Sequence, residues 1–266
     1  MRSSAPATDR SRPTPSRKLR GVLLPAEHGS WGLIAEPLLL GLLVAPSLPG
    51  LAVAVFAFSA FLLRTPMLRV WRFRQLSSPD PQRGRVRRFL LTNLIVMHTG
   101  LAAAALTARG PWLLPIVLAS PLALWVLRVQ YKGQTRKLWP ELVAAIALGS
   151  PAAAMLLAAG APAEAAYWAW GALAIKSITS IVFVRTQIKR FHNRPHARVP
   201  MLALHVAVPV ALVLFDRGIG MPLLYGALAL RAAVLTALPV RSAKHVGWIE
   251  VAISLAFVLA LSTLIP

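Results

Sequence analysis

Residues 138–159 have the sequence LWPELVAAIALGSPAAAMLLAA, in which Glu141 is the only charged residue. A helix rises 1.5 Å per residue, so about twenty apolar residues are enough to cross the roughly 30 Å hydrocarbon core of a membrane. This stretch therefore predicts a transmembrane helix.

Similar apolar runs fill most of the chain. Hydrophobic residues make up 57% of the 266 and charged residues 14%, whereas an ordinary soluble domain has roughly a quarter charged residues. We therefore expect an all-α, polytopic membrane helical bundle, a single domain over residues 23–266. Its nine expected spans are 23–45, 51–70, 89–107, 112–129, 138–159, 165–184, 199–215, 221–239 and 247–265.

The charges between these runs predict the topology. Lys and Arg are concentrated in the first twenty residues and in loops 69–88, 132–137, 185–198 and 241–244, whereas the intervening loops hold only Arg109 and Arg217. Every second loop is thus basic, which by the positive-inside rule predicts a cytoplasmic N-terminus and an external C-terminus. Residues 1–22 are rich in Arg, Ser and Pro and lack an apolar run, which indicates a disordered cytoplasmic tail rather than a signal peptide.

Composition also limits the partners. The net charge of +21 is interleaved with the spans, so the partner that we expect is the lipid bilayer and not nucleic acid. Heavy use of Ala, Arg, Pro, Leu and Val suggests a GC-rich bacterial genome, and hence the bacterial inner membrane. The chain has no cysteine, which excludes disulfides and thiolate metal sites. We expect no cofactor and no bound metal.

A few ionisable residues lie inside the expected spans. Glu36, His98, Lys176 and Arg231 are far from the ends of their apolar runs. An unpaired charge at such depth costs at least about 3 kcal/mol, so we expect Glu36 to pair with either Lys176 or Arg231, in a structural or a functional role. We expect His98 and His205 to form hydrogen bonds across helices.

The segment before and within the first span is unusual. Residues 24–32 read LPAEHGSWG, which places Glu27 and His28 side by side at the expected cytoplasmic boundary, where proton transfer or anion binding is chemically accessible. Trp31 is expected to anchor the chain at the interface. Arg64 and Arg185 end apolar runs, and arginine there can form paired bonds to phosphate or carboxylate.

This segment resembles the N-terminal signature of the YwiC-like family of bacterial membrane proteins. The resemblance rests on residues 25–31, PAEHGSW, followed by PLLLG at 37–41, and on FVRTQIKR at 183–190. It implies a bacterial membrane protein and adds no particular reaction.

A second resemblance is to the UbiA-type prenyltransferases. It rests on nine spans, on long inner loops after spans two and six, and on residues 131–142, where Tyr131 and Lys132 precede Lys137 and a Pro-Glu-Leu sequence. Those enzymes hold Mg²⁺ and a prenyl diphosphate with Asp-rich motifs at the ends of spans two and six. The matching stretches here, RTPMLR at 64–69 and RTQIKR at 185–190, contain no acid. Carboxylates recruit Mg²⁺, whereas arginines bind an anion directly. The resemblance therefore implies an apolar cavity with an arginine-lined cytoplasmic mouth.

Three functions compete. The first is binding of an anionic amphiphile, an isoprenoid phosphate or a phospholipid, at this mouth. The second is a divergent, metal-independent prenyl transfer with Glu27 or His28 as the catalytic base. The third is small-anion transport along Lys176, Arg231 and His98, although the two halves of the chain show no repeat. The candidate binding residues are Trp31, Glu36, Arg64, Arg69, His98, Tyr131, Lys132, Lys176, Arg185 and Arg190.

Overall fold

The computed structural model describes residues 23–24, 28–73, 82–133, 137–215, 218–239 and 242–265. These residues form nine helices with short connections and no strands, so the predicted all-α fold is confirmed. The helices are α2 His28–Val44, α3 Leu48–Phe73, α4 Arg83–Thr107, α5 Leu113–Tyr131, α6 Leu138–Ala159, α7 Ala163–Phe191, α8 Arg198–Leu214, α9 Gly220–Ala237 and α10 Ala243–Ser262.

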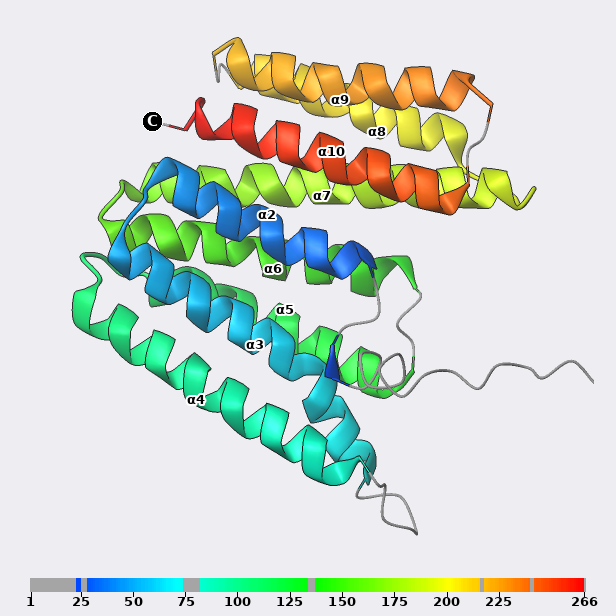
Figure 1. Cartoon of the computed structure of the whole chain (residues 1–266). Helices are drawn as coiled ribbons and strands as arrows, with labels where there is room; N and C mark the ends of the chain where they lie inside the picture. Colours follow the sequence, from blue (N-terminus) through cyan, green and yellow to red (C-terminus); the bar gives the residue numbers. More distant parts are fainter. Residues whose placement is uncertain are drawn as a thin grey trace, which may run out of the picture.

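The helices run side by side and alternate in direction (Figure 1). The closest neighbours are α3 with α4, α6 with α7, α5 with α6, and α2 with α6, while α8 pairs with α9. Helices α2, α6 and α7 therefore lie in the middle of the bundle, with α4 at one edge and α8 and α9 at the other. Because helix directions alternate, α2 begins and α10 ends at opposite ends of the bundle.

Several helices extend beyond their apolar runs. Helix α4 begins at Arg83 instead of residue 89, and α7 continues to Phe191 instead of residue 184. Hydropathy marks where a chain leaves lipid, whereas a helix continues as long as its backbone bonds form, and arginine and lysine are good helix formers. Helix α6 ends at Ala159 and is capped by Gly160, whose φ of 90° is a left-handed conformation that glycine adopts readily.

Seven of the described helices are long and apolar enough to cross a membrane, and α2 and α8, with 17 residues each, are shorter apolar helices. Prolines lie inside α2, α3, α5, α6 and α8. Interior prolines are tolerated in membrane helices because neighbouring helices satisfy the freed backbone groups. The chain is therefore a multi-pass membrane protein.

The two ends of the bundle are packed differently. The end of the bundle where α3, α5, α7 and α9 finish, on the right in Figure 1, is called the basic end. The opposite end, on the left, is called the far end. The larger apolar cluster lies in the far half, where residues 152–158 of α6 are almost completely buried against the adjoining parts of α2, α3 and α7. A smaller cluster in the basic half contains Phe183, Met201, Ala232 and Val246.

Candidate functional site: a basic end and a buried polar network

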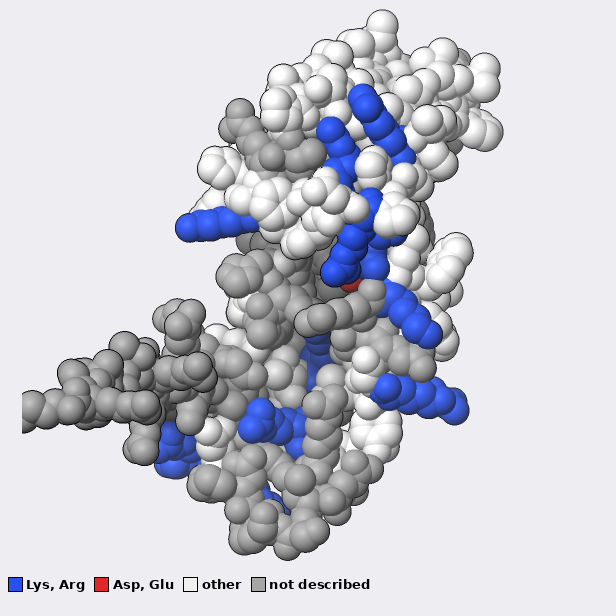
Figure 2. Space-filling view, turned by 90° about the vertical axis from the view of Figure 1, so that its right-hand side faces the viewer, with Lys and Arg blue, Asp and Glu red and all other residues white. Residues whose placement is uncertain are grey.

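Positive charge covers the basic end. Figure 2 looks onto this end and shows Lys and Arg spread across it with almost no acid. Among the described acids of this end, Glu141 is half-buried. Arg109 lies instead at the far end, where its backbone N–H donates to the Ala158 carbonyl of α6. The described cations of the basic end are Arg64, Arg69, Arg83, Arg85, Arg87, Arg88, Arg128, Lys132, Lys137, Arg185, Lys189, Arg190, Arg194, Arg198 and Lys244.

Four of these cations differ from the rest in burial. Arg64 and Arg69 of α3 and Arg185 and Arg190 of α7 are half-buried, whereas the others, Lys132 included, are exposed. The Arg185 Nη1 atom lies 2.8 Å from Glu141 Oε2 of α6, and Arg190 Nη1 donates to Gln187 Oε1 at 2.9 Å. A half-buried guanidinium loses part of its hydration and has a restricted geometry, which suits it to bind an oxyanion.

Aromatic side chains connect the helices that carry some of these cations. Trp31 of α2 packs on Phe58 and Phe61 of α3, with ring centroids 6.4 and 5.7 Å away. Tyr131, at the end of α5, stacks on Trp71 of α3 at 4.4 Å. The predicted residues Trp31 and Tyr131 thus join α2, α3 and α5 at the basic end.

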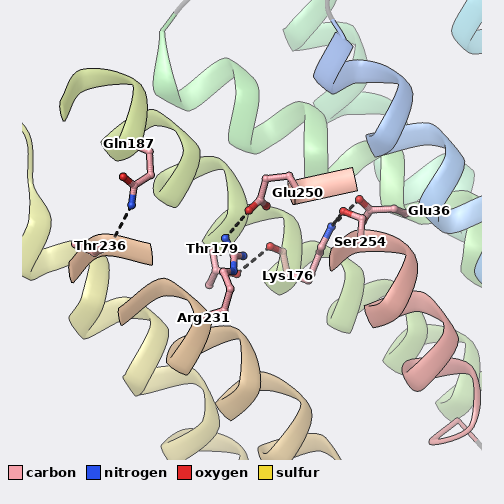
Figure 3. Close-up of polar contacts among 8 residues, drawn as sticks. All are labelled: Glu36, Lys176, Thr179, Gln187, Arg231, Thr236, Glu250 and Ser254. Carbon is pink, nitrogen blue, oxygen red and sulfur yellow. Dashed lines mark hydrogen bonds and ion pairs between the residues drawn. The ribbon is translucent and has the colours of Figure 1, made fainter. Parts of the chain in front are cut away.

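In the middle of the bundle, one ion pair links α2 to α7. Lys176 Nζ lies 2.6 Å from Glu36 Oε1, both side chains are buried, and the same ammonium donates to Ser254 of α10 (Figure 3). Glu36 therefore pairs with Lys176, which decides between the two partners expected from the sequence. Since the pair is shielded from water, each charge depends on the other.

Arg231 of α9 has a different partner, Glu250 of α10, with which it forms a second ion pair (Figure 3). The guanidinium carbon also lies 4.2 Å from the centre of the Phe183 ring of α7, a cation–π contact. The side chains of Arg231 and Glu250 are 12% and 13% exposed, so this pair too is largely shielded from water.

Further polar contacts continue toward the basic end. Gln187 of α7 donates to Thr236 of α9 at 3.1 Å, and both are buried. Beside them, Phe183 and Gln187 line a small recess between α7, α9 and α10. Its other lining residues are Leu235, Leu238, Pro239, Val246 and Ile249.

Two of the sequence expectations for histidines are wrong. His98 is exposed on α4 and contacts the Leu94 carbonyl of its own helix at 2.7 Å. His205 is buried, yet its Nδ1 atom also contacts its own helix, at the Met201 carbonyl. The sequence indicates how far along a helix a residue lies, but not whether its side chain faces another helix. His98 is exposed because α4 lies at the edge of the bundle.

The two catalytic candidates belong to the segment before α2. Glu27 lies outside the described residues, as does the predicted tail at 1–22, and His28 is described only as the first residue of α2. Among the described residues, no three His, Asp or Glu side chains come together in a way that could hold a metal ion.

Sequence reasoning missed the Arg231–Glu250 pair and the hydroxyl and amide groups around it. The sequence does contain a pattern that indicates this polar interior, namely polar residues spaced as on one face of a helix. Lys176, Ser180, Phe183 and Gln187 follow one another at three or four residues in α7, as do Glu250 and Ser254 in α10. Such spacing puts side chains on one helix face.

The fold and these buried charges define a polytopic helical membrane protein with a polar interior toward its basic end. The model of the YwiC-like protein family matches residues 24–156, half of the chain, and the chain belongs to that family. No curated protein and no solved structure matches the chain. Neither search links it to the UbiA-type prenyltransferases, so that resemblance stays a prediction.

Proposed function

We propose that this protein binds the anionic head of a membrane amphiphile, an isoprenoid phosphate or a phospholipid, at its basic end. The bundle lies in a bacterial inner membrane with this end and the N-terminus in the cytoplasm, as the positive-inside rule favours. The observation that carries the proposal is the set of half-buried arginines on α3 and α7, Arg64, Arg69, Arg185 and Arg190, at an end where the described residues include many cations and few acids.

The chemistry of these groups suits such a ligand. Guanidinium groups bind phosphate through two parallel hydrogen bonds, and partial burial strengthens each bond by lowering the local dielectric. Trp31 and Tyr131 lie at the same end, and such rings prefer the level of lipid headgroups. Lys132 and the other exposed cations raise the local concentration of anions around this end.

The arrangement favours binding over the two alternatives. For anion transport, Lys176, Arg231 and His98 would have to line one path, but His98 is exposed on α4 and Arg231 lies on α9, at the opposite edge of the bundle. For prenyl transfer, the expected base is Glu27 or His28, and the stretches 64–69 and 185–190, which the resemblance matches to the Asp-rich motifs, contain arginine and no acid. A changed isoprenoid or quinone profile on deletion of the gene would favour transfer instead.

The test is the lipid that co-purifies with the protein. Mass spectrometry of the full-length chain in mild detergent is compared for wild type, for R64Q/R185Q, and for R83Q/R198Q, which removes two exposed cations from the same end. We expect an anionic lipid on the wild type and on R83Q/R198Q, and its loss from R64Q/R185Q. The same lipid content in all three proteins would overturn the proposal.

A further inference from the structure

Arg231 is held in place by two contacts. Its Nη1 atom pairs with Glu250 Oε1, and its guanidinium carbon lies 4.2 Å from the centre of the Phe183 ring. Together these contacts fix the position of the group and leave the opposite edge, Nε and Nη2, for other partners. At 1.5 Å per residue, Arg231 lies about 9 Å from the end of α9 at Ala237, well inside the bundle.

That edge is buried and has no hydrogen-bond partner among the described residues. The Nε–H and Nη2–H bonds of a guanidinium are parallel and match two oxygens of a phosphate or carboxylate. Burying two N–H donors without acceptors costs free energy. A ligand that accepts hydrogen bonds from both donors removes this cost, which favours its binding.

An acceptor without a partner lies beside the same ring. His205 is 2% exposed and packs edge-on against Phe183, with ring centroids 6.3 Å apart. Its Nδ1 atom lies 2.8 Å from the Met201 carbonyl, which can only accept, so Nδ1 carries the proton and Nε2 of the neutral ring is an acceptor. This Nε2 atom is buried without a partner among the described residues. The Glu250 carboxylate is already paired with the guanidinium and interacts with the Ser180 hydroxyl of α7.

These groups select one ligand chemistry. The ligand has to accept two hydrogen bonds from Arg231 and also donate one, to His205 Nε2. A phosphate monoester in its singly charged form does both, because it has unprotonated oxygens and a P–OH group. Sulfate and phosphodiesters have no such hydroxyl at neutral pH. A dianion is further disfavoured because Glu250 already balances the charge of Arg231.

The approach to this site is from the basic end. Phe183 lines the recess between α7, α9 and α10 and also contacts Arg231, so its ring separates the two. In the other direction the bundle is closed by the larger apolar cluster, to which Tyr225 of α9 and Phe257 of α10 belong. A ligand therefore enters past Phe183.

We infer that Arg231 and His205, with Glu250 balancing the charge of Arg231, form a binding site for a singly charged phosphate group that has a P–OH, entered from the basic end past Phe183. The group is either inorganic phosphate or the head of a lipid such as phosphatidic acid. The inference goes beyond the function proposed above, since none of Arg64, Arg69, Arg185 and Arg190 takes part in this site.

The test measures binding of radiolabelled inorganic phosphate, and of phosphatidic acid against phosphatidylglycerol, to the full-length protein in detergent. R231K keeps the charge that pairs with Glu250 but removes the paired N–H groups, and R198Q serves as a control at the exposed surface. We expect R231K to lose at least about tenfold in affinity, as for charged hydrogen bonds, with R198Q unchanged. We also expect sulfate to compete at least about tenfold more weakly than phosphate.

Comparing free phosphate with phosphatidic acid shows whether the bound group belongs to a soluble ligand or to a lipid. Arg231-dependent binding of free phosphate indicates a soluble ligand, and Arg231-dependent binding of phosphatidic acid without free phosphate indicates a lipid head. Equal binding of phosphatidylglycerol, equal competition by sulfate, or binding that R231K leaves unchanged would overturn the inference. If R231K does not give a monodisperse protein, phosphate binding is measured on H205Q, and phosphate and sulfate are compared on the wild type. Unchanged phosphate binding in H205Q together with equal competition by sulfate would then overturn the inference.

The outcome is distinguishable from that of the surface proposal. Loss of co-purified lipid in R64Q/R185Q with no Arg231-dependent binding of either probe would support the surface site and contradict the deeper one. Arg231-dependent binding with unchanged lipid content in R64Q/R185Q would do the reverse.

Discussion

The far half and the basic half of this bundle share the same helices but differ in the side chains that fill their interiors. In the far half, alanines and leucines of α6 pack against α2, α3 and α7 with almost no exposed surface. From the middle of the bundle toward the basic end, the interior holds two ion pairs, a buried histidine and a glutamine–threonine contact. Close apolar packing stabilises the arrangement of helices, whereas buried charges cost free energy and are kept where they serve a function.

The largest effect should come from breaking the central ion pair. Lys176→Met leaves the Glu36 carboxylate buried without its cation, which should reduce the free energy of unfolding by about 3–5 kcal/mol. The double variant E36Q/K176M should recover most of this loss, because no unpaired charge remains. Unfolding in mixed micelles by titration with denaturing detergent measures both. Equal stability of K176M and wild type would show that the pair is not shielded from water.

A smaller effect is expected from the far half. A Cβ atom on Gly100 of α4 would lie 2.8 Å from Phe56 N and 3.0 Å from Ala52 O of α3, so Gly100→Ala has to push the two backbones apart. We expect a loss of about 1–3 kcal/mol in the free energy of unfolding. Gly171→Ala is the matched control in α7, since its Cβ would meet nothing within 4 Å. The control should be neutral or gain up to about 1 kcal/mol. An equal loss in both variants would contradict close packing at Gly100.

The smallest effect on stability should come from the surface pair of the basic end. Arg185 and Glu141 are 30% and 39% exposed, and exposed pairs contribute about 0–1 kcal/mol. Arg185→Gln should therefore leave the unfolding midpoint nearly unchanged, even where it alters lipid binding. A loss as large as that of K176M would mean that Arg185 is structural, and that its proposed role as a ligand is wrong.

The sequence was sufficient for the fold and for part of the site. Apolar runs located every helix because lipid requires them, and the cost of a buried charge limited the partners of Glu36 to Lys176 and Arg231. It could not choose between these two, because the choice depends on which helices lie beside α2. The same lack of information about neighbours explains why His98 was expected in the interior, and why Glu250 was not paired with Arg231.

The basic end and the recess can be tested together, because the chain has no cysteine of its own. Single cysteines are introduced as Q187C, which lines the recess, and as A153C, in the apolar cluster of α6. Each is treated with a small, charged, membrane-impermeant thiol reagent, in intact cells and in inverted membrane vesicles. We predict that Q187C reacts in inverted vesicles and not in intact cells, while A153C reacts in neither. Reaction of Q187C from the outside only, or no faster than A153C, would contradict a polar interior that opens toward a cytoplasmic basic end.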